Sequence, residues 1–245
     1  MSDVLVLCYH AVSSSWEAEL SVTPDDLERQ VAFLLGRGWQ AATFCEAALN
    51  PSAPRTVAIT FDDAFASVRD YAAPILSALG VPATVFAPTM YLATGSLTWP
   101  GIEHWKDAPP AYEMNAMSWE DLGGLKELGW EIGSHTRSHP HLTQLDDDTL
   151  NDELEGSRSD CARELGCSCQ TIAYPYGDVD VRVARKAKQV GYLAGASLSG
   201  RLERLGPYRH PRVGVYHKDG RWRFRLKAAP LMRELRASRA WRRGS

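Results

Sequence analysis

No stretch of the sequence is apolar for long enough to span a bilayer, and the chain has neither an internal repeat nor a low-complexity tract. Residues 1–10 also lack a positively charged segment ahead of their short apolar run, so we expect a first β-strand over residues 4–8 and no signal peptide. These absences argue against a membrane-spanning protein and favour a protein of the cytoplasm.

Cysteine is scarce: the chain has five, an odd number, with none of the spacing of a disulfide framework. Cys167 and Cys169 are too close together for a standard zinc-binding pair, and no second pair is available to join them. We therefore expect Cys161, Cys167 and Cys169 to be buried free thiols, as is usual in a reducing compartment.

The remaining composition is ordinary for one soluble α/β domain, with 245 residues, 44% hydrophobic and 23% charged. Strand-like and helix-like stretches alternate, which favours a parallel sheet covered by helices, closed or nearly closed into a barrel. A long segment without periodicity, residues 88–117, carries Trp99 and Trp105. Their rings would either stack on sugar rings or pack on the protein surface.

Two adjacent acids follow the clearest buried strand. Residues 57–61 alternate β-branched and other apolar side chains and lead directly into Asp62 and Asp63. In parallel α/β sheets, ligands bind at the carboxyl ends of the strands. The pair suggests a metal ligand beside a proton acceptor, although a solvated turn in which Asp63 caps the next helix gives the same pattern.

Three histidines follow another short strand, residues 131–132. The first two, His135 and His139, are four residues apart, near enough to bind one ion, and Pro140 disfavours helical geometry at His139. Two imidazoles and one carboxylate leave a fourth position for water, which is typical of a catalytic rather than a structural zinc. Histidines at this spacing mean little alone, but together with the acid pair they predict a metal site.

These residues resemble the motifs of a known family. Thr60–Asp63 and Ser134–His139 are similar to the first two motifs of the polysaccharide deacetylases, the NodB homology domain of carbohydrate esterase family 4. Ala173–Gly177 is similar to the third motif. The resemblance spans roughly residues 4–215 and implies an α/β fold, a distorted (β/α) barrel with seven or eight strands.

The sequence departs from the family pattern in two places. Many members carry an arginine where this chain has Ala173. We also find no clean version of the late Leu-x-His motif, which supplies the general acid in better-known members. The branch resembled is the one with Tyr-Pro-Tyr-Gly in the third motif and an amino-terminal Tyr-His, here Tyr9 and His10.

The resemblance implies a metal centre with a base beside it. Asp63, His135 and His139 would hold a divalent metal ion, for which zinc is our choice by ligand type, although cobalt, nickel or iron would accept the same ligands. Asp62 would be the general base that takes the proton of the attacking water.

The other catalytic roles are assigned from the motifs and from position. Tyr176, which follows Pro175, would donate its backbone N–H to the oxyanion, as the resemblance also implies. His10, at the end of the first strand, and His210, late in the chain, are the candidates for the general acid, and we favour His210. We place Arg212 beside Asp62 as a replacement for the arginine missing from the third motif.

The function implied is that of a metal-dependent carbohydrate N-deacetylase. It would remove the N-acetyl group from an N-acetylhexosamine unit of a glycan, a lipid-linked sugar or a small glycoconjugate. Two alternatives stay open: a deformylase or cyclic-amide hydrolase on the same scaffold, and a catalytically silent glycan-binding module. Nucleic acid is not an expected partner.

The net charge of −3 conceals an uneven distribution, since residues 1–211 carry −12 and the rest of the chain carries +9. We divide the chain into a catalytic domain, residues 1–220, and a basic extension, residues 221–245. Alternation predicts a strand over residues 221–227, and residues 230–243 have the pattern of an amphipathic helix. The helix would either pack on the domain or attach to an anionic membrane surface.

Overall fold

The computed structural model describes residues 3–100, 102, 111–199, 201–203, 205–238 and 241. Within these residues, nine strands form one parallel sheet, in which eight follow the order β10-β9-β8-β7-β6-β5-β1-β11 and β4 pairs with β5. The strands are β1 (Asp3–Tyr9), β4 (Gln40–Ala42), β5 (Arg55–Phe61), β6 (Ala83–Ala87), β7 (Glu131–Ser134), β8 (Thr171–Ala173), β9 (Ala194–Ser197), β10 (His210–Pro211) and β11 (Val213–Gly214). Two further strands, β2 (Ala11–Val12) and β3 (Ser21–Val22), pair separately.

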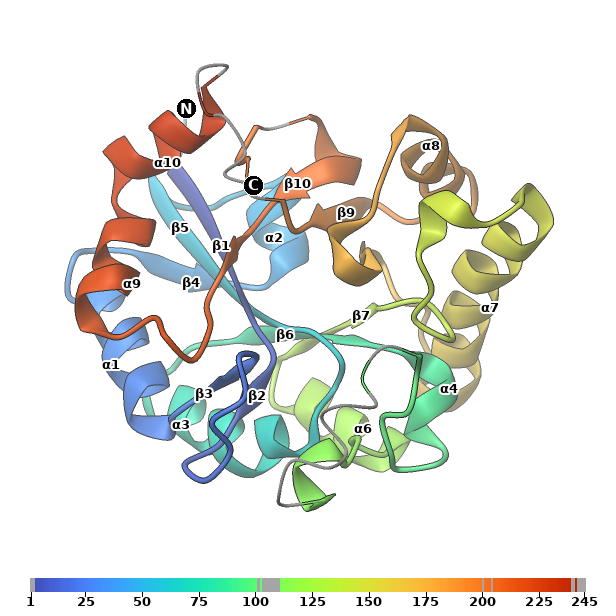
Figure 1. The fold of residues 1–245 in the computed structure, drawn as a ribbon, viewed down its shortest axis with the longest axis horizontal. Helices are drawn as coiled ribbons and strands as arrows, with labels where there is room; N and C mark the ends of the chain where they lie inside the picture. Colours follow the sequence, from blue (N-terminus) through green and yellow to red (C-terminus); the bar gives the residue numbers. More distant parts are fainter. Residues whose placement is uncertain are drawn as a thin grey trace.

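The sheet is nearly closed as a barrel. Its two end strands, β10 and β11, are consecutive in the chain and are parted by Arg212 alone. One continuous segment therefore pairs with β9 on one side and with β1 on the other (Figure 1). The predicted distorted (β/α) barrel with seven or eight strands is confirmed.

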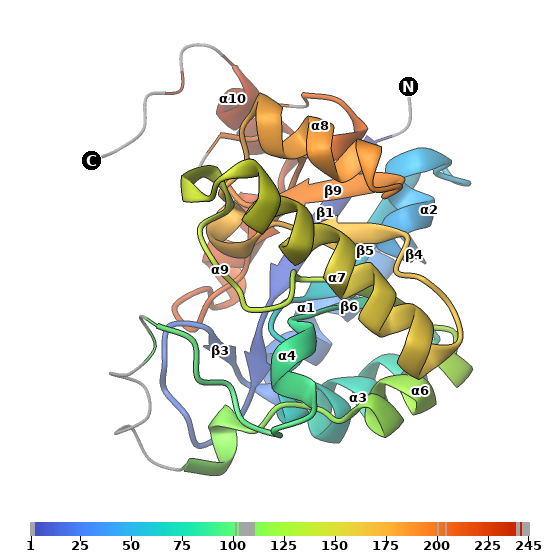
Figure 2. The ribbon, with the colours of Figure 1, turned by 90° about the vertical axis from the view of Figure 1, so that its right-hand side faces the viewer.

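Helices surround the strands (Figure 1), and Figure 2 shows α7 and α8 lying over them on one side. The α-helices are α1 (Pro24–Leu35), α2 (Phe44–Leu49), α3 (Ala73–Ala78), α4 (Thr89–Leu92), α6 (Trp119–Glu127), α7 (Asp147–Leu165), α8 (Val181–Gln189), α9 (Arg221–Ala228) and α10 (Pro230–Ala237). Shorter helical turns are η1 (Val68–Ala72), η2 (Ala111–Met114), η3 (Leu142–Gln144), η4 (Pro175–Gly177) and η5 (Pro207–Arg209). Polar capping residues fix where several helices begin. At the start of α1, for example, the hydroxyl of Thr23 accepts a hydrogen bond from the backbone N–H of Asp26 at 3.1 Å.

Side chains alternate between the outer and inner faces of each strand. On β1, Leu5, Leu7 and Tyr9 pack in the large core beneath the surrounding helices, whereas Val6 belongs to a smaller cluster inside the barrel. This inner cluster consists largely of alanines from the strands, with two aromatic rings: Ala58, Ala173, Ala194, Ala196, Phe44 and Phe86. Because these inner residues are mostly small, the barrel can also hold the fully buried side chain of Arg212.

The strand predicted over residues 221–227 is wrong, because the segment forms helix α9. Phe224 and Ala228 are four residues apart, so a helix places both on one side, where they are buried in the large core. The ring of Phe224 contacts the ring of Phe33 on α1, with centroids 6.4 Å apart. Burial of these two apolar side chains therefore outweighs the alternating pattern.

The predicted amphipathic helix exists as α10, which ends at Ala237. Arg233 ties it to the start of β1, donating to both carboxylate oxygens of Asp3 at 2.8 Å. Of the residues beyond Ser238, only Trp241 lies within the described part. Within that part, no helix combines the length and the apolar character needed to cross a bilayer. The predicted contact with an anionic membrane is not supported.

The expectation that Cys161 and Cys169 are free thiols is wrong, because the two form a disulfide. Helix α7 ends at Gly166, whose φ of 67° turns the chain back, and the Cα atoms of the two cysteines come within 6.0 Å. Cys8, Cys45 and Cys167 are free, and Cys167 is exposed rather than buried. Since a disulfide is typical of oxidising compartments, the cysteines no longer argue for the cytoplasm.

Candidate metal centre and active site

The two adjacent acids stand at the carboxyl end of β5. The backbone N–H of Asp62 still donates to the carbonyl of Tyr9, at 3.0 Å, and so continues the pairing with β1. Asp63 and Ala64 then adopt left-handed conformations with φ of 71° and 56°. This twist lets two consecutive carboxylates face the same site, which an extended strand would not allow. The following helical turn begins only at Val68.

The histidine turn follows β7 and is held from behind by helix α7. Thr136 and His139 are left-handed, with φ of 67° and 62°. Between them, the backbone N–H groups of Arg137 and Ser138 donate to one carboxylate oxygen of Glu153 at 2.8 and 2.9 Å. The hydroxyl of Ser138 donates to the other oxygen of Glu153. A buried acid on α7 therefore fixes the turn that brings His135 and His139 together.

Left-handed backbone outside glycine is confined to this site in the part of the chain that the structure describes. Five non-glycine residues there have positive φ, and all lie in the three turns that form the site: Asp63, Ala64, Thr136, His139 and Tyr176. Such conformations cost about 1–3 kcal/mol each and persist only where the surrounding structure enforces them. The strain is concentrated where the fold presents its polar groups.

Asp63, His135 and His139 converge as candidate metal ligands. The Oδ1 atom of Asp63 lies 3.4 Å from the Nε2 atom of each histidine. All three side chains are buried, and their ligand atoms lie within 4.8 Å of one another. We call these three residues the metal group. Zinc bonds of about 2.0–2.1 Å at tetrahedral angles would place ligand atoms roughly 3.3 Å apart, so the spacing fits such an ion. Oδ1 of Asp63 accepts no hydrogen bond within the described residues, which also suits a metal ligand.

Each histidine ring has its own support. Nδ1 of His135 lies 2.7 Å from the carbonyl oxygen of Ala173 and must donate to it, which leaves Nε2 as the nitrogen with a free lone pair. The ring of His139 stacks on Trp99, with centroids 4.2 Å apart. Trp99 is buried, so its ring is not available to stack on a sugar. Trp105, the other candidate for stacking, lies outside the described residues.

The carboxylates of the site are charged in spite of their burial. Burial by itself would raise the pKa of Asp63, but the two imidazoles beside it, those of His135 and His139, hold it well below its usual range. For His135, burial lowers the pKa, yet the charges of Asp62, whose Oδ2 is 3.9 Å from Nε2, and of Asp63 together outweigh burial and raise it. The group thus offers negative charge that a cation would neutralise.

Asp62 is held by Arg212, which emerges between β10 and β11. Nη1 and Nη2 of the guanidinium donate to Oδ1 and Oδ2 of Asp62 at 2.6 and 2.7 Å. Nη1 also lies 3.1 Å from the hydroxyl of Thr60. Burial would raise the pKa of Asp62, but the charge of Arg212 lowers it to about 2. The predicted place of Arg212 beside Asp62 therefore agrees with the geometry.

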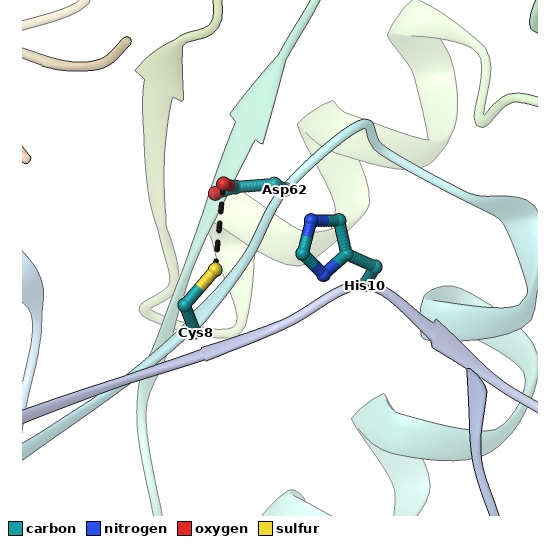
Figure 3. Close-up of side chains that lie close together, drawn as sticks. All are labelled: Cys8, His10 and Asp62. Carbon is teal, nitrogen blue, oxygen red and sulfur yellow. Dashed lines mark hydrogen bonds between the residues drawn. The ribbon is translucent and has the colours of Figure 1, made fainter. Parts of the chain in front are cut away.

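Cys8 and His10 lie close to Asp62 (Figure 3). The thiol of Cys8 donates to Oδ2 of Asp62 over 3.4 Å, and burial raises the pKa of this thiol, which keeps its proton. Ligand-type atoms of these three residues also lie within 4.8 Å of one another. Arg212 already donates a hydrogen bond to each carboxylate oxygen of Asp62. We therefore regard Cys8 and His10 as supports and reaction partners of this carboxylate rather than as parts of a second metal site.

His210, the candidate that we favour for the general acid from the sequence, lies against an aromatic residue of the inner cluster. Its ring lies edge-on to Phe44 of α2, with centroids 5.8 Å apart. Its Nδ1 is 3.1 Å from the carbonyl oxygen of Pro211. His210 precedes Arg212 by two residues, so it points into the barrel one layer further from the carboxyl ends of the strands. Between the two candidates for the general acid, the placement favours His10.

Pro175 and Tyr176 form the turn η4 at the carboxyl end of β8. Pro175 is buried, while about half of Tyr176 is exposed, and the φ of Tyr176 is 59°. The ring of Tyr176 meets His139 edge-on, with centroids 4.7 Å apart, and stacks on His141 at 4.0 Å. The third motif therefore flanks the metal group, as expected, and His141 lies behind the tyrosine rather than among the ligands.

Two residues of the site, Cys8 and Glu153, were not predicted from the sequence, and the support that Trp99 gives to His139 was not predicted either. Cys8 precedes His10 by two residues on a strand, so it faces the same side, and this spacing was a usable signal. Glu153 and Trp99 reach the histidine turn from a helix and from a long loop. No local pattern marks them, because their partners are distant in the chain.

Comparison with known proteins identifies the family. The model of the polysaccharide deacetylase family matches residues 50–195, more than half of the chain. Among curated proteins, YxkH of Bacillus subtilis (strain 168), which is named after the polysaccharide deacetylases, is 26% identical over 198 residues. That match covers 78% of this chain, and the chain spans only 63% of the length of YxkH.

Solved structures share the fold. The deacetylase PplD of Streptococcus pyogenes, determined in complex with acetate, has a TM-score of 0.73 and 22% identity, over 88% of this chain and 93% of its own. The de-N-acetylase of Aggregatibacter actinomycetemcomitans has a TM-score of 0.75 and 18% identity, over 91% of this chain and 99% of its own. At this identity the likeness shows a common fold.

Proposed function

The chain belongs to the polysaccharide deacetylase family, and on this premise we propose that it is a metal-dependent carbohydrate N-deacetylase. It would remove the N-acetyl group from an N-acetylhexosamine unit of a glycan, a lipid-linked sugar or a small glycoconjugate. The observation that carries the proposal is the convergence of Asp63, His135 and His139 beside a second, separately held carboxylate, Asp62. A glycan-binding module would have no need of this combination.

The ligand set suits a catalytic zinc ion. Two neutral imidazoles and one carboxylate are supplied by the chain, and Nδ1–H of His135 is fixed by the carbonyl of Ala173, as is usual for histidines that bind metals. A bound ion of this kind polarises the acetamide carbonyl and lowers the pKa of water. The remaining requirements of amide hydrolysis fall to side chains and backbone groups of the chain itself.

Asp62 is suited to act as the base that takes the proton of the attacking water. The charge of Arg212 lowers the pKa of its carboxyl and keeps it ionised at neutral pH. The two hydrogen bonds from Arg212 fix the plane of the carboxylate and leave further lone pairs on its oxygens for a water proton. General acid–base catalysis by one such group typically contributes about 10²–10⁴-fold to the rate.

His10 is suited to pass a proton to the departing amine. Its ring lies beside Asp62 (Figure 3), and its Nδ1 neither accepts nor donates a hydrogen bond within the described part of the chain. Burial lowers the pKa of His10, so the protonated ring would give up its proton readily. The proton that Asp62 takes from water can thus reach the leaving nitrogen through a neighbouring group.

Tyr176 would stabilise the oxyanion. Its left-handed backbone turns the segment at the carboxyl end of β8, and its ring contacts His139. A backbone N–H aimed at the developing oxyanion is typically worth about 3–4 kcal/mol. This role fits the place of the third motif on the rim of the metal group.

The direct test is product release by metal-loaded protein. We expect acetate from short N-acetylglucosamine oligomers, loss of release on chelation, and recovery with zinc. Parallel reactions with N-formyl and cyclic-amide substrates separate the rival hydrolyses. Formate release without acetate release would make the protein a deformylase, and sugar binding without any hydrolysis by metal-replete protein would make it a binding module. Either result would overturn the proposal.

A further inference from the structure

A groove of about 1170 Å³ leads away from the metal group. It is lined by Tyr176, whose ring contacts the metal-ligand candidate His139. Apolar side chains of the carboxyl-terminal helices also line it, among them Leu226 of α9 and Met232 of α10. A substrate whose acetamide reaches the metal group would extend along this groove.

The lining of the groove is more basic than acidic. Four of its residues are cationic and two are acidic: Arg201, Arg209, Lys227, Arg236, Asp178 and Glu203. Two of the cations have carboxylate partners, since Arg201 lies 3.1 Å from Glu203 and Lys227 pairs with Asp219, which is outside the groove. For Arg209, no carboxylate of the described residues lies within ion-pair distance.

Arg209 is fixed close to the reacting end of the groove. It is the last residue of η5, and the preceding carbonyl, that of Tyr208, accepts a hydrogen bond from the hydroxyl of Tyr174 at 2.8 Å. Tyr174 is buried and leads directly into Pro175 and Tyr176. The segment that carries Arg209 is thus attached to the strand end that carries the third motif. Arg209 itself is half-buried.

Partial enclosure of a guanidinium costs hydration free energy, and for Arg209 no carboxylate of the described residues offsets that cost. Arg236, which lines the same groove, is also half-buried, and burial lowers its pKa. An anion in the groove would offset this cost. Guanidinium groups suit phosphate and carboxylate, to which they donate paired hydrogen bonds.

We propose that this groove binds an anionic group, a phosphate or a carboxylate, attached to the sugar whose N-acetyl group is removed. The inference rests on the proposed deacetylase function and narrows its substrate to an acidic glycoconjugate. Arg209 is the principal contact of the anion, and the net positive lining supports it.

The test compares three forms of N,N′,N″-triacetylchitotriose: the neutral methyl glycoside, the 1-phosphate and the aldonic acid. The zinc-loaded protein should show a lower KM for at least one acidic form than for the neutral form, with similar kcat. Comparing the KM of the 1-phosphate with that of the aldonic acid shows whether the groove prefers a phosphate or a carboxylate. Arg209→Gln should raise the KM of the acidic form about fivefold and leave the neutral form unchanged. Rising salt should raise the KM of the acidic form in the unmodified protein only.

Arg221→Gln is the matched control, because it removes one positive charge from an exposed position of α9 outside the groove. Equal KM values for the three sugars, or an equal effect of both variants, would overturn the inference while leaving the deacetylase function intact. If no sugar releases acetate, the proposed function fails instead. Calorimetric binding of the three sugars to Asp62→Asn protein then still decides the preference for the anion.

Discussion

The guanidinium of Arg212 and the carboxylate of Asp62 form a bidentate pair across 150 residues of sequence, with nitrogen–oxygen distances of 2.6 and 2.7 Å. Both side chains are buried. Arg212 also lies over the ring of Phe86, 5.5 Å from its centroid. Ala173, at the position where the family resemblance implies an arginine, is one of the small residues of the inner cluster. The site therefore has a guanidinium, but it enters from another strand.

Replacing Arg212 by Met should cost about 3–5 kcal/mol of unfolding free energy, because a buried carboxylate is left without its counter-ion. It should also lower kcat for deacetylation by about 100-fold or more, since the base loses its orientation. Denaturant unfolding and acetate release measure the two effects. In the double variant with Asp62→Asn most of the lost stability should return. A double variant as unstable as Arg212→Met alone would contradict the pairing as the cause.

Replacing His139 by Gln should reduce bound zinc from about one equivalent to a small fraction, because one of three ligands is lost. His141→Gln is the matched control, since His141 stacks on the far side of Tyr176 and should leave the metal content unchanged. Elemental analysis after dialysis gives the answer. Equal metal loss in both variants would place the metal elsewhere in the histidine turn.

Glu153→Ala should weaken zinc binding about 10–100-fold without touching a ligand, because the turn that carries His135 and His139 loses its anchor. Two backbone N–H groups also lose their acceptor, which should lower the stability by roughly 1–3 kcal/mol. Competition with a chelator of known affinity measures the first effect. Glu155→Ala, an exposed change on the same helix, should alter neither the zinc affinity nor the stability. Unchanged zinc affinity in Glu153→Ala would show that the turn holds its shape alone.

His10→Gln should lower kcat by about 10²–10³-fold with little change in KM, as expected for a group that moves a proton. His210→Gln should leave kcat within about twofold, because the ring lies against Phe44 and away from Asp62. Steady-state acetate release compares the two. A large loss of kcat in the second variant alone would restore His210 as the general acid.

Glu131 should make the stability depend on pH. Burial raises the pKa of its carboxyl above 4.5, although hydrogen bonds from Thr171, Cys45 and Thr84 act in the opposite direction and lower it. Since the folded pKa is higher than the unfolded one, its contribution to stability is complete below about pH 4.5 and is lost as the pH rises through the folded value. Glu131→Gln should therefore gain stability relative to the unmodified protein over that range. The gain is about 1.4 kcal/mol for every pH unit between the unfolded and folded pKa values. A difference in unfolding free energy that stays constant with pH would contradict this assignment.

Local signals determined much of this protein. The strand that ends in Asp62 and Asp63 and the spacing of His135 and His139 predicted the metal group, because each depends on neighbours in the chain. The alternation of strands and helices predicted the barrel, since it requires parallel strands joined by crossovers. Helix starts likewise depend on neighbours in the chain, as at α1, whose first turn is capped by the hydroxyl of Thr23.

The tertiary structure alone decided the features whose partners are far apart or whose local pattern was ambiguous. The tertiary structure favoured His10 over His210 as the general acid. The reason is that the register of the strands in the barrel sets how far each side chain lies from their carboxyl ends. It made α9 a helix, because burying Phe224 in the core gained more than an alternating pattern could. It joined Cys161 to Cys169 through the left-handed turn at Gly166. In each case burial and pairing across the fold, which no short window of sequence contains, set the outcome.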